Sequence, residues 1–254
     1  MTASPARARA GSWFDDRFRS ARAEFSLFCF PFAGGTAAYY ASWAAAFAGD
    51  VVELVPVQPP GRGARMSEPG AESITAMAEE VAALIAGSGN RILLLGHSMG
   101  AITAFEVARR LERLGRPAEF LTVSGRPSPV LTRPLSPVST LPRGEFVEML
   151  REYGAAPDEV LAHEELLDVL IPMMRADFAM IEGYRYSPGP ALSCPVRAWC
   201  GSRDPEVTPA DMRGWGAMTE NRFELSVRPG GHFFLTDHRN EVAAEVLNAV
   251  AALG

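Results

Sequence analysis

A serine near the middle of the chain lies between two glycines, in a setting that suits a nucleophile. Residues 96–100 read Gly-His-Ser-Met-Gly, with Ser98 at the centre. Residues 92–95 form a continuous apolar run, typical of a strand buried on both faces, and apolar residues from Ala101 onward recur at helical spacing. Such glycines let strand and helix approach closely, so that the hydroxyl stands on a tight turn between them. The pattern predicts nucleophilic attack by Ser98; a plain strand-to-helix turn with an incidental serine is the alternative.

A nucleophilic serine needs a base within hydrogen-bond reach and an acid that fixes the tautomer of that base. His232 lies on a Gly-rich loop after the last predicted strand, at the sheet edge where Ser98 is expected. Asp204 directly follows the preceding strand, and Ser-Asp-His is the chain order known for a serine on such a turn. We therefore predict Asp204 as the acid. A turn or helix cap is the other interpretation of Asp204, and Asp211 is the reserve candidate.

The other three histidines are weaker candidates for the base. His97 adjoins Ser98, but the turn should point its side chain away. His163 lies in a segment without strand signals, and His238 lies near the start of the last helix, where a surface role is expected. His232 is thus the predicted base.

Two backbone amides are candidates for stabilising a negative charge on the substrate oxygen. The amide of Met99 opens a helix, where free N–H groups and the positive dipole end favour an oxyanion. The second donor should come from the Gly-rich loop after an early strand, and we choose Ala33. A simple strand–helix turn is the alternative for residues 31–36. A phosphate-binding loop would need Gly-x-x-x-x-Gly-Lys-Ser/Thr, which is absent there.

Strands and helices alternate along the chain and would position these residues. The pattern predicts an α/β fold in which a parallel, twisted sheet carries helices on both faces, within a single domain over residues 1–254. Strands are predicted at 26–30, 51–57, 92–95, 119–124, 195–200 and 222–227, and helices at 37–47, 72–86, 101–110, 143–153, 164–184, 209–218 and 241–253.

Residues 127–192 interrupt this alternation. They contain Pro-rich joints and two helical stretches but no strand signal, and Pro172 should kink or split the second helix. We expect an all-helical lid that gates access to the strand ends. Its methionines suit either an adaptable binding surface or an ordinary helical core: Met149, Met173, Met174 and Met180.

Composition excludes several other classes of protein. A net charge of −6 argues against non-specific binding to nucleic acid or to an anionic membrane. The three cysteines have neither disulfide-framework nor metal-site spacing, and we expect small core residues. No secretory signal and no run of about 18 apolar residues is visible. We expect a cytoplasmic monomer without metal or cofactor.

Taken together, these motifs resemble those of the type II thioesterases, the editing hydrolases that accompany polyketide and non-ribosomal peptide synthases. The resemblance runs from about Trp13 to the C-terminus, and it departs at Phe32, where many members carry histidine. That change affects only a neighbouring side chain, because the donor in this loop is a backbone amide. The similar segments are residues 30–35, 58–65, 96–100, 174–178, 201–205 and 230–235.

The resemblance implies an α/β-hydrolase fold and hydrolysis of acyl groups from the phosphopantetheine arm of acyl or peptidyl carrier protein domains. Carried over to this sequence, the functional residues are Ser98 as nucleophile, His232 as base, Asp204 as acid, and the amides of Ala33 and Met99 as the oxyanion hole. Two alternatives are a small-molecule carboxylesterase or lipase with the same triad, and a non-catalytic receptor with a hydrolase fold. The filled triad positions disfavour the receptor.

Three arginines have two interpretations. Arg62, Arg65 and Arg133 could contact an acidic helix of a carrier protein. The simpler expectation is that they are solvated surface residues.

Overall fold

Six parallel strands form the sheet that carries the predicted site residues. The computed structural model describes residues 12–47, 49, 51–131, 137–156 and 158–253. The strand order is β2-β1-β3-β4-β5-β6, and every neighbouring pair is parallel. All six predicted strands are present: β1 (Phe25–Phe30), β2 (Val52–Pro56), β3 (Arg91–His97), β4 (Phe120–Ser124), β5 (Val196–Gly201) and β6 (Phe223–Arg228).

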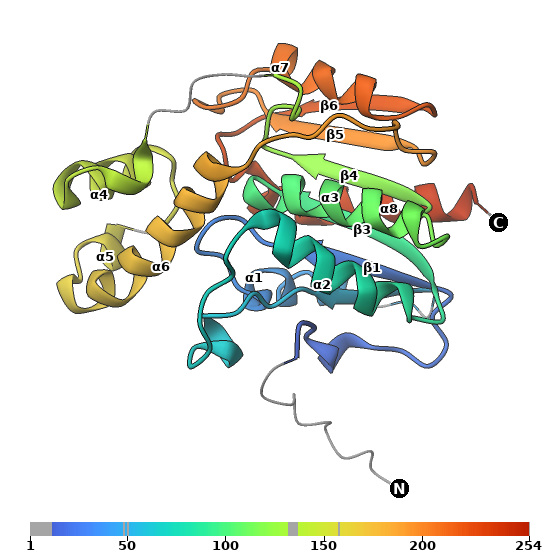
Figure 1. Ribbon diagram of the computed structural model, residues 1–254, viewed down its shortest axis with the longest axis horizontal. Helices are drawn as coiled ribbons and strands as arrows, with labels where there is room; N and C mark the ends of the chain where they lie inside the picture. The colour runs from blue at the N-terminus through green and yellow to red at the C-terminus, as the bar shows by residue number, and fades with distance from the viewer. Residues whose placement is uncertain (1–11, 48, 50, 132–136, 157, 254) are drawn as a thin grey trace, which may run out of the picture.

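Helices cover both faces of the sheet, which confirms the predicted fold class (Figure 1). Alternate residues of each inner strand enter different cores, so Phe28 and Leu94 belong to one core and Leu27 and Leu93 to the other. Helices α2 (Ile74–Ala86) and α3 (Met99–Arg113) cover the first, and α1 (Ala37–Ala41) and α8 (Arg239–Ala251) cover the second. Burial on both faces explains why these strands read as continuous apolar runs.

Two helices that we predicted as continuous change type part-way. The expected helix 37–47 consists of α1 and a 3₁₀ turn, Ala44–Phe47. The expected helix 209–218 consists of α7 (Pro209–Arg213) and a 3₁₀ turn, Gly214–Met218. In the first case Tyr40 and Trp43 are both buried with their rings 5.3 Å apart, and tighter winding brings residues three apart onto one side.

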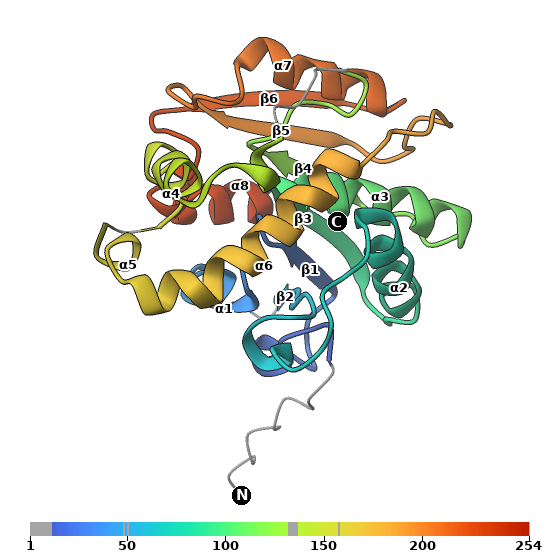
Figure 2. The same cartoon turned by 60° about the vertical axis from the view of Figure 1, so that its left-hand side comes forward.

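The segment between β4 and β5 is helical and lies beyond the carboxyl ends of the strands (Figure 2). It contains α4 (Arg143–Glu152), α5 (Asp158–Leu161), which we did not predict, and α6 (Glu164–Gly183). We predicted a kink or a split at Pro172; the split does not occur, because α6 runs through the proline without a break. Buried residues on both sides of it, Leu167, Ile171 and Met174 among them, pack in a separate small core and hold the helix together.

The methionines of this segment divide between the two interpretations. Met149 and Met174 are buried in the small core, and Met180 is buried in the main core. Met174 also lines the pocket described below. Met173 is only partly buried against the small core. Three of the four side chains therefore fill cores, and one of these, Met174, does so at the edge of the site.

Candidate active site

Ser98 lies on a strained turn between β3 and α3. Its φ of 54° and ψ of −116° make it the one non-glycine residue with positive φ in the described part of the chain. Holding such a conformation costs about 1–3 kcal/mol, which the surrounding structure must supply. The Ser98 amide donates to the Ser124 carbonyl at 2.8 Å, and the Ser98 carbonyl accepts from the Ala101 amide at 3.0 Å. Both ends of the residue are thus fixed while its side chain faces a pocket.

The two flanking glycines are needed for close backbone approach. A Cβ atom on Gly96 would lie 2.0 Å from the Gly100 carbonyl oxygen, and one on Gly100 would lie 2.1 Å from the Phe30 carbonyl oxygen. Real Cβ contacts are never this short, and a backbone oxygen cannot swing aside as a side chain can. The glycines therefore allow β3, the turn and β1 to meet.

We expect Gly100→Ala to destabilise the fold by about 3 kcal/mol or more, because the added methyl group overlaps a backbone carbonyl in a packed interior. Urea unfolding followed by circular dichroism measures this loss. Gly144→Ala is the matched control, since a Cβ there meets nothing within 4 Å and the residue lies inside α4. It should leave stability unchanged or raise it by up to about 1 kcal/mol. Equal effects of the two substitutions would contradict the packing argument.

The structure brings His232 and Asp204 together from two loops. His232 follows β6 and Asp204 follows β5, and His232 Nδ1 donates to Asp204 Oδ2 at 2.8 Å. The side chains are 4% and 0% exposed, so the pair is shielded from solvent. Asp204 Oδ1 accepts from the Glu206 amide at 2.9 Å, which fixes the carboxylate. A proton held on Nδ1 leaves Nε2 free to accept another, as a general base requires.

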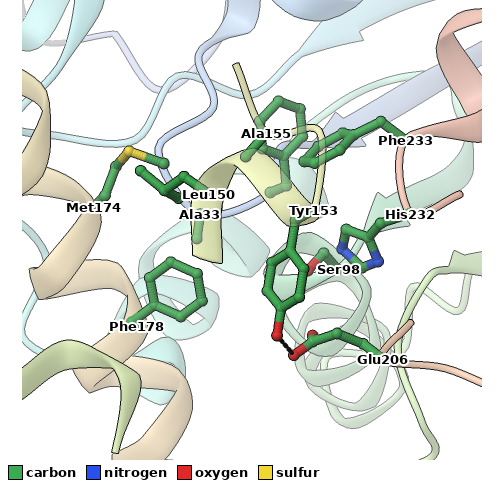
Figure 3. Close-up of a pocket in the computed structure, with 11 residues that line it drawn as sticks. Ala33, Ser98, Leu150, Tyr153, Ala155, Met174, Phe178, Glu206, His232 and Phe233 are labelled. Atoms are coloured by element: carbon green, nitrogen blue, oxygen red, sulfur yellow. Dashed lines mark hydrogen bonds between the residues drawn. The ribbon is translucent and has the colours of Figure 1, made fainter. Parts of the chain in front are cut away.

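Ser98 and His232 line the same pocket, where their side chains lie next to each other (Figure 3). The apolar wall of this pocket comes largely from the segment between β4 and β5. The lining residues are Phe32, Ala33, Ser98, Leu150, Tyr153, Ala155, Met174, Phe178, Glu206, His232 and Phe233. An elongated apolar group could pack against this wall while its carbonyl carbon meets Ser98.

The two predicted oxyanion donors flank Ser98 with free amides. Ala33 lines the pocket, and Met99 is the first residue of α3. Among the described residues, neither amide donates to a protein acceptor, whereas Gly34 donates to Asp177 Oδ2 at 2.7 Å and Gly35 to the Phe32 carbonyl at 2.9 Å. Free N–H groups beside a nucleophile suit a developing oxyanion.

Sequence reasoning missed the part that His97 has in the site. Its buried ring lies with its centroid 4.9 Å from that of His232, and its Nδ1 is 3.2 Å from Ser124 Oγ. Burial, and then the nearby His232, hold the pKa of His97 well below its usual value. A neutral ring beneath His232 lets a positive charge form there without like-charge repulsion. Alternation along β3 could have indicated that His97 points to the same face of the sheet as Leu93 and Leu95, and not into solvent.

Tyr153 and Glu206 were also missed. The Tyr153 hydroxyl, at the end of α4, donates to the Glu206 carboxylate across the pocket (Figure 3). Burial, followed by the bond to Glu206, raises the pKa of Tyr153, so the phenol stays protonated and keeps donating. This bond links the helical segment to the loop that carries Asp204.

Asp211, the reserve acid, has a structural role. It completes a capping box at the start of α7: its Oδ2 accepts from the Thr208 amide at 2.9 Å and from Thr208 Oγ1 at 2.7 Å, and its own amide donates to Thr208 Oγ1. Asp204, not Asp211, is the carboxylate that contacts His232.

The prediction of solvated arginines is wrong for two of the three. Arg62 is 3% exposed and pairs with Asp177. Arg65 is 7% exposed, with its guanidinium 4.3 Å from the centre of the Trp13 ring. Asp177 and Trp13 lie far from these arginines along the chain, which local sequence does not reveal, whereas Arg65 also pairs with Glu68 three residues on. Arg133 lies outside the described residues.

The described part of the chain contains no cluster of histidine, cysteine and acidic residues that could hold a metal ion. Its helices include no candidate for a membrane span. The three cysteines are free and buried, as expected of small core residues.

Comparison with known proteins gives the family of this chain. Residues 25–250 match the family model of the thioesterase domain. The chain belongs to the thioesterase family. The Streptomyces venezuelae thioesterase PikA5 is 35% identical over 97% of this chain and 88% of its own length. The structure of BorB, a type II thioesterase from the borrelidin biosynthetic cluster, is 38% identical over 93% of this chain and 97% of BorB, with a TM-score of 0.85.

One relative carries a different name. Linear gramicidin dehydrogenase LgrE of Brevibacillus parabrevis is 35% identical over 91% of this chain and 90% of its own length. The name of that relative refers to a dehydrogenase, and the dinucleotide-binding turn typical of many dehydrogenases reads Gly-x-Gly-x-x-Gly after a strand. At the corresponding turn after β3, this thioesterase has Ser98 in place of the second glycine.

The predictions of an α/β-hydrolase fold, of the type II thioesterase family and of a thioester hydrolase are confirmed.

Proposed function

We propose that this thioesterase removes acyl groups from the phosphopantetheine arm of acyl or peptidyl carrier domains, as an editing enzyme of a polyketide or non-ribosomal peptide synthase. The observation that carries the proposal is the 2.8 Å contact between His232 and Asp204 at the pocket that holds Ser98. Its family membership, and relatives such as BorB from a biosynthetic cluster, support the substrate class.

In this proposal Ser98 Oγ attacks the thioester carbonyl carbon, and its proton passes to His232 Nε2 while Asp204 stabilises the imidazolium. The amides of Ala33 and Met99 donate to the oxyanion. The C–S bond then breaks, and His232 returns the proton to the leaving thiolate. Water, deprotonated by His232, attacks the resulting ester, which releases the acid and restores Ser98.

We propose further that residues 127–192 act as a lid within a single hydrolase domain. Supporting this, Leu150, Tyr153, Met174 and Phe178 form one wall of the pocket, so movement of α4 and α6 would open it. The hydrogen bond from Tyr153 to Glu206 would hold the closed position.

We also propose that the enzyme acts in the cytoplasm, as a monomer and without a cofactor. The acyl transfer described above uses only side chains, two backbone amides and water.

We expect kcat/KM for an acyl group on a carrier protein to exceed that for the same acyl group in an oxygen ester by at least about tenfold, a difference of about 1.4 kcal/mol in transition-state stabilisation. Side-by-side turnover of the two substrates measures the ratio. A preference for the oxygen ester would favour the carboxylesterase or lipase alternative. Failure of a fluorophosphonate probe to label Ser98 would instead favour the non-catalytic receptor.

A further inference from the structure

A fully buried carboxylate of α6 contacts the loop that carries Ala33. Asp177 Oδ2 accepts from the Gly34 amide at 2.7 Å, and the Asp177 side chain is 0% exposed. Arg62 binds the same carboxylate with both terminal nitrogens: Nη2 donates to Oδ1 at 2.6 Å, and Nη1 donates to Oδ2. Asp177 therefore joins three segments, which are α6, the loop before α2 and the loop after β1.

A pair of this kind is poorly explained by stability alone. Removing two charges from water costs several kcal/mol per ion, and apolar residues of similar size often stabilise a core as well or better. The two-pronged contact with Arg62 does, however, fix the orientation of the carboxylate. Its remaining hydrogen bond is directed to a backbone amide beside the pocket.

This bond clamps one of the two peptide groups that flank Ala33. The peptide group between Ala33 and Gly34 is held through the Gly34 amide by Asp177. The one between Phe32 and Ala33 is held through the Phe32 carbonyl, which accepts from Gly35. The free Ala33 amide belongs to this second group, so its direction depends on the loop as a whole. Gly34 has a φ of 80°, and a Cβ there would lie 2.9 Å from Met174 Cγ, so α6 also packs directly on the loop.

We propose that Asp177, oriented by Arg62, is a positioning residue that aligns the Ala33 amide as an oxyanion donor. Because Asp177 belongs to α6, the oxyanion hole is complete only when this helix is seated over the site. The proposal rests on the assignment of Ser98 and Ala33 under the proposed function.

Asp177→Ala should lower kcat for a small acyl thioester, such as an acyl-N-acetylcysteamine, by about 10²-fold, as loss of one oxyanion donor does. KM should change by less than about threefold, because the donor acts in the transition state and not in the bound ground state. Asp177→Asn should fall between the two enzymes, since its amide oxygen can still accept from Gly34 although the charge facing Arg62 is lost.

An acyl trifluoromethyl ketone gives a readout that a merely structural role would not move. Ser98 Oγ bonds to its carbonyl carbon, the serine proton passes to His232, and the carbonyl oxygen becomes an oxyanion. Asp177→Ala should weaken this inhibitor by the same factor as kcat/KM, while a non-reactive acyl thioether binds as in the parent enzyme. An inhibition constant for the trifluoromethyl ketone that is unchanged in Asp177→Ala would overturn the proposal. If Asp177→Ala fails to fold, an unchanged inhibition constant in Asp177→Asn would overturn it in the same way.

Glu106→Gln is the matched control. Glu106 is a buried carboxylate of α3 that accepts from Arg110 Nη1 at 2.6 Å and from Tyr184 Oη, at the end of α6, at 2.7 Å. The substitution disturbs a buried ion pair and a contact of α6 with the body, but not the loop of Ala33. It should lower thermal stability with kcat per folded molecule unchanged.

The outcomes separate this inference from the proposed function. An active Ser98→Ala variant would defeat the assignment of the nucleophile, on which both rest. An inactive Ser98→Ala variant together with a fully active Asp177→Ala variant would overturn only the positioning role. Failure to act on carrier-bound substrates would leave the trifluoromethyl ketone test intact, because that test uses small molecules alone.

Discussion

Ser98→Ala should lower kcat for an acyl thioester by about 10⁶-fold, the loss measured for the nucleophile of another serine hydrolase. The substitution removes the atom that forms the acyl-enzyme. His232, Asp204 and both oxyanion amides stay in place, but without the nucleophile they act only on bound substrate and water. Single-turnover hydrolysis, with quantification of the released acid, measures the very low rate constants that steady-state assays cannot reach.

Ser128→Ala is the control for this experiment. Ser128 is buried, and its hydroxyl has no hydrogen-bond partner in the described part of the chain. Its removal should leave kcat within about twofold. Neither variant should change the free energy of unfolding by more than about 1 kcal/mol, since the Ser98 hydroxyl caps no helix. A Ser98→Ala enzyme that kept a hundredth of its activity would show that the acyl group is transferred directly to water.

The strands and the order of the site residues were predictable because both depend on local patterns. Buried parallel strands read as apolar runs, and their carboxyl ends meet at one edge of the sheet. Loops after β3, β5 and β6 must therefore bring Ser98, Asp204 and His232 to the same edge. The choice between Asp204 and Asp211 followed from distance to the strand end, and the contact with His232 agrees with it.

Contacts between distant segments were not predictable in this way. Arg62 and Asp177 are 115 positions apart, and Asp177 and Gly34 are 143 apart. Nothing near Arg62 in the sequence shows that a carboxylate will meet it inside the fold, so a surface position was the natural expectation. The bond between Tyr153 and Glu206 spans 53 positions and was missed for the same reason.

Two helical segments differ from what local signals indicate, because packing overrides local preference there. Pro172 removes one helical hydrogen bond, yet α6 continues because apolar residues before and after the proline share a small core. After α1, in contrast, the α-helix ends although no proline or glycine interrupts the helical pattern. The burial of both Tyr40 and Trp43 favours a tighter turn there.

Asp204→Asn should lower kcat by about 10⁴-fold while the fold is kept. Asp204 Oδ2 accepts the Nδ1 proton of His232 and so leaves Nε2 free to accept a proton. An asparagine can turn its NH₂ group to Nδ1, which favours the tautomer with the proton on Nε2. That tautomer cannot accept the serine proton. The rate of reaction with a fluorophosphonate probe should fall together with kcat, because both need Ser98 deprotonated.

Asp211→Asn makes the same chemical change at the reserve candidate. It disturbs the capping box of α7, so it should cost about 1 kcal/mol of stability, with kcat within about twofold. The two variants thus have opposite signatures: one is stable and nearly inactive, the other weakened and active. The reverse result would make Asp211 the acid and reduce the 2.8 Å contact of Asp204 with His232 to a structural bond. Since both carboxylates are buried, burial alone cannot produce this difference; only the contact with the imidazole can.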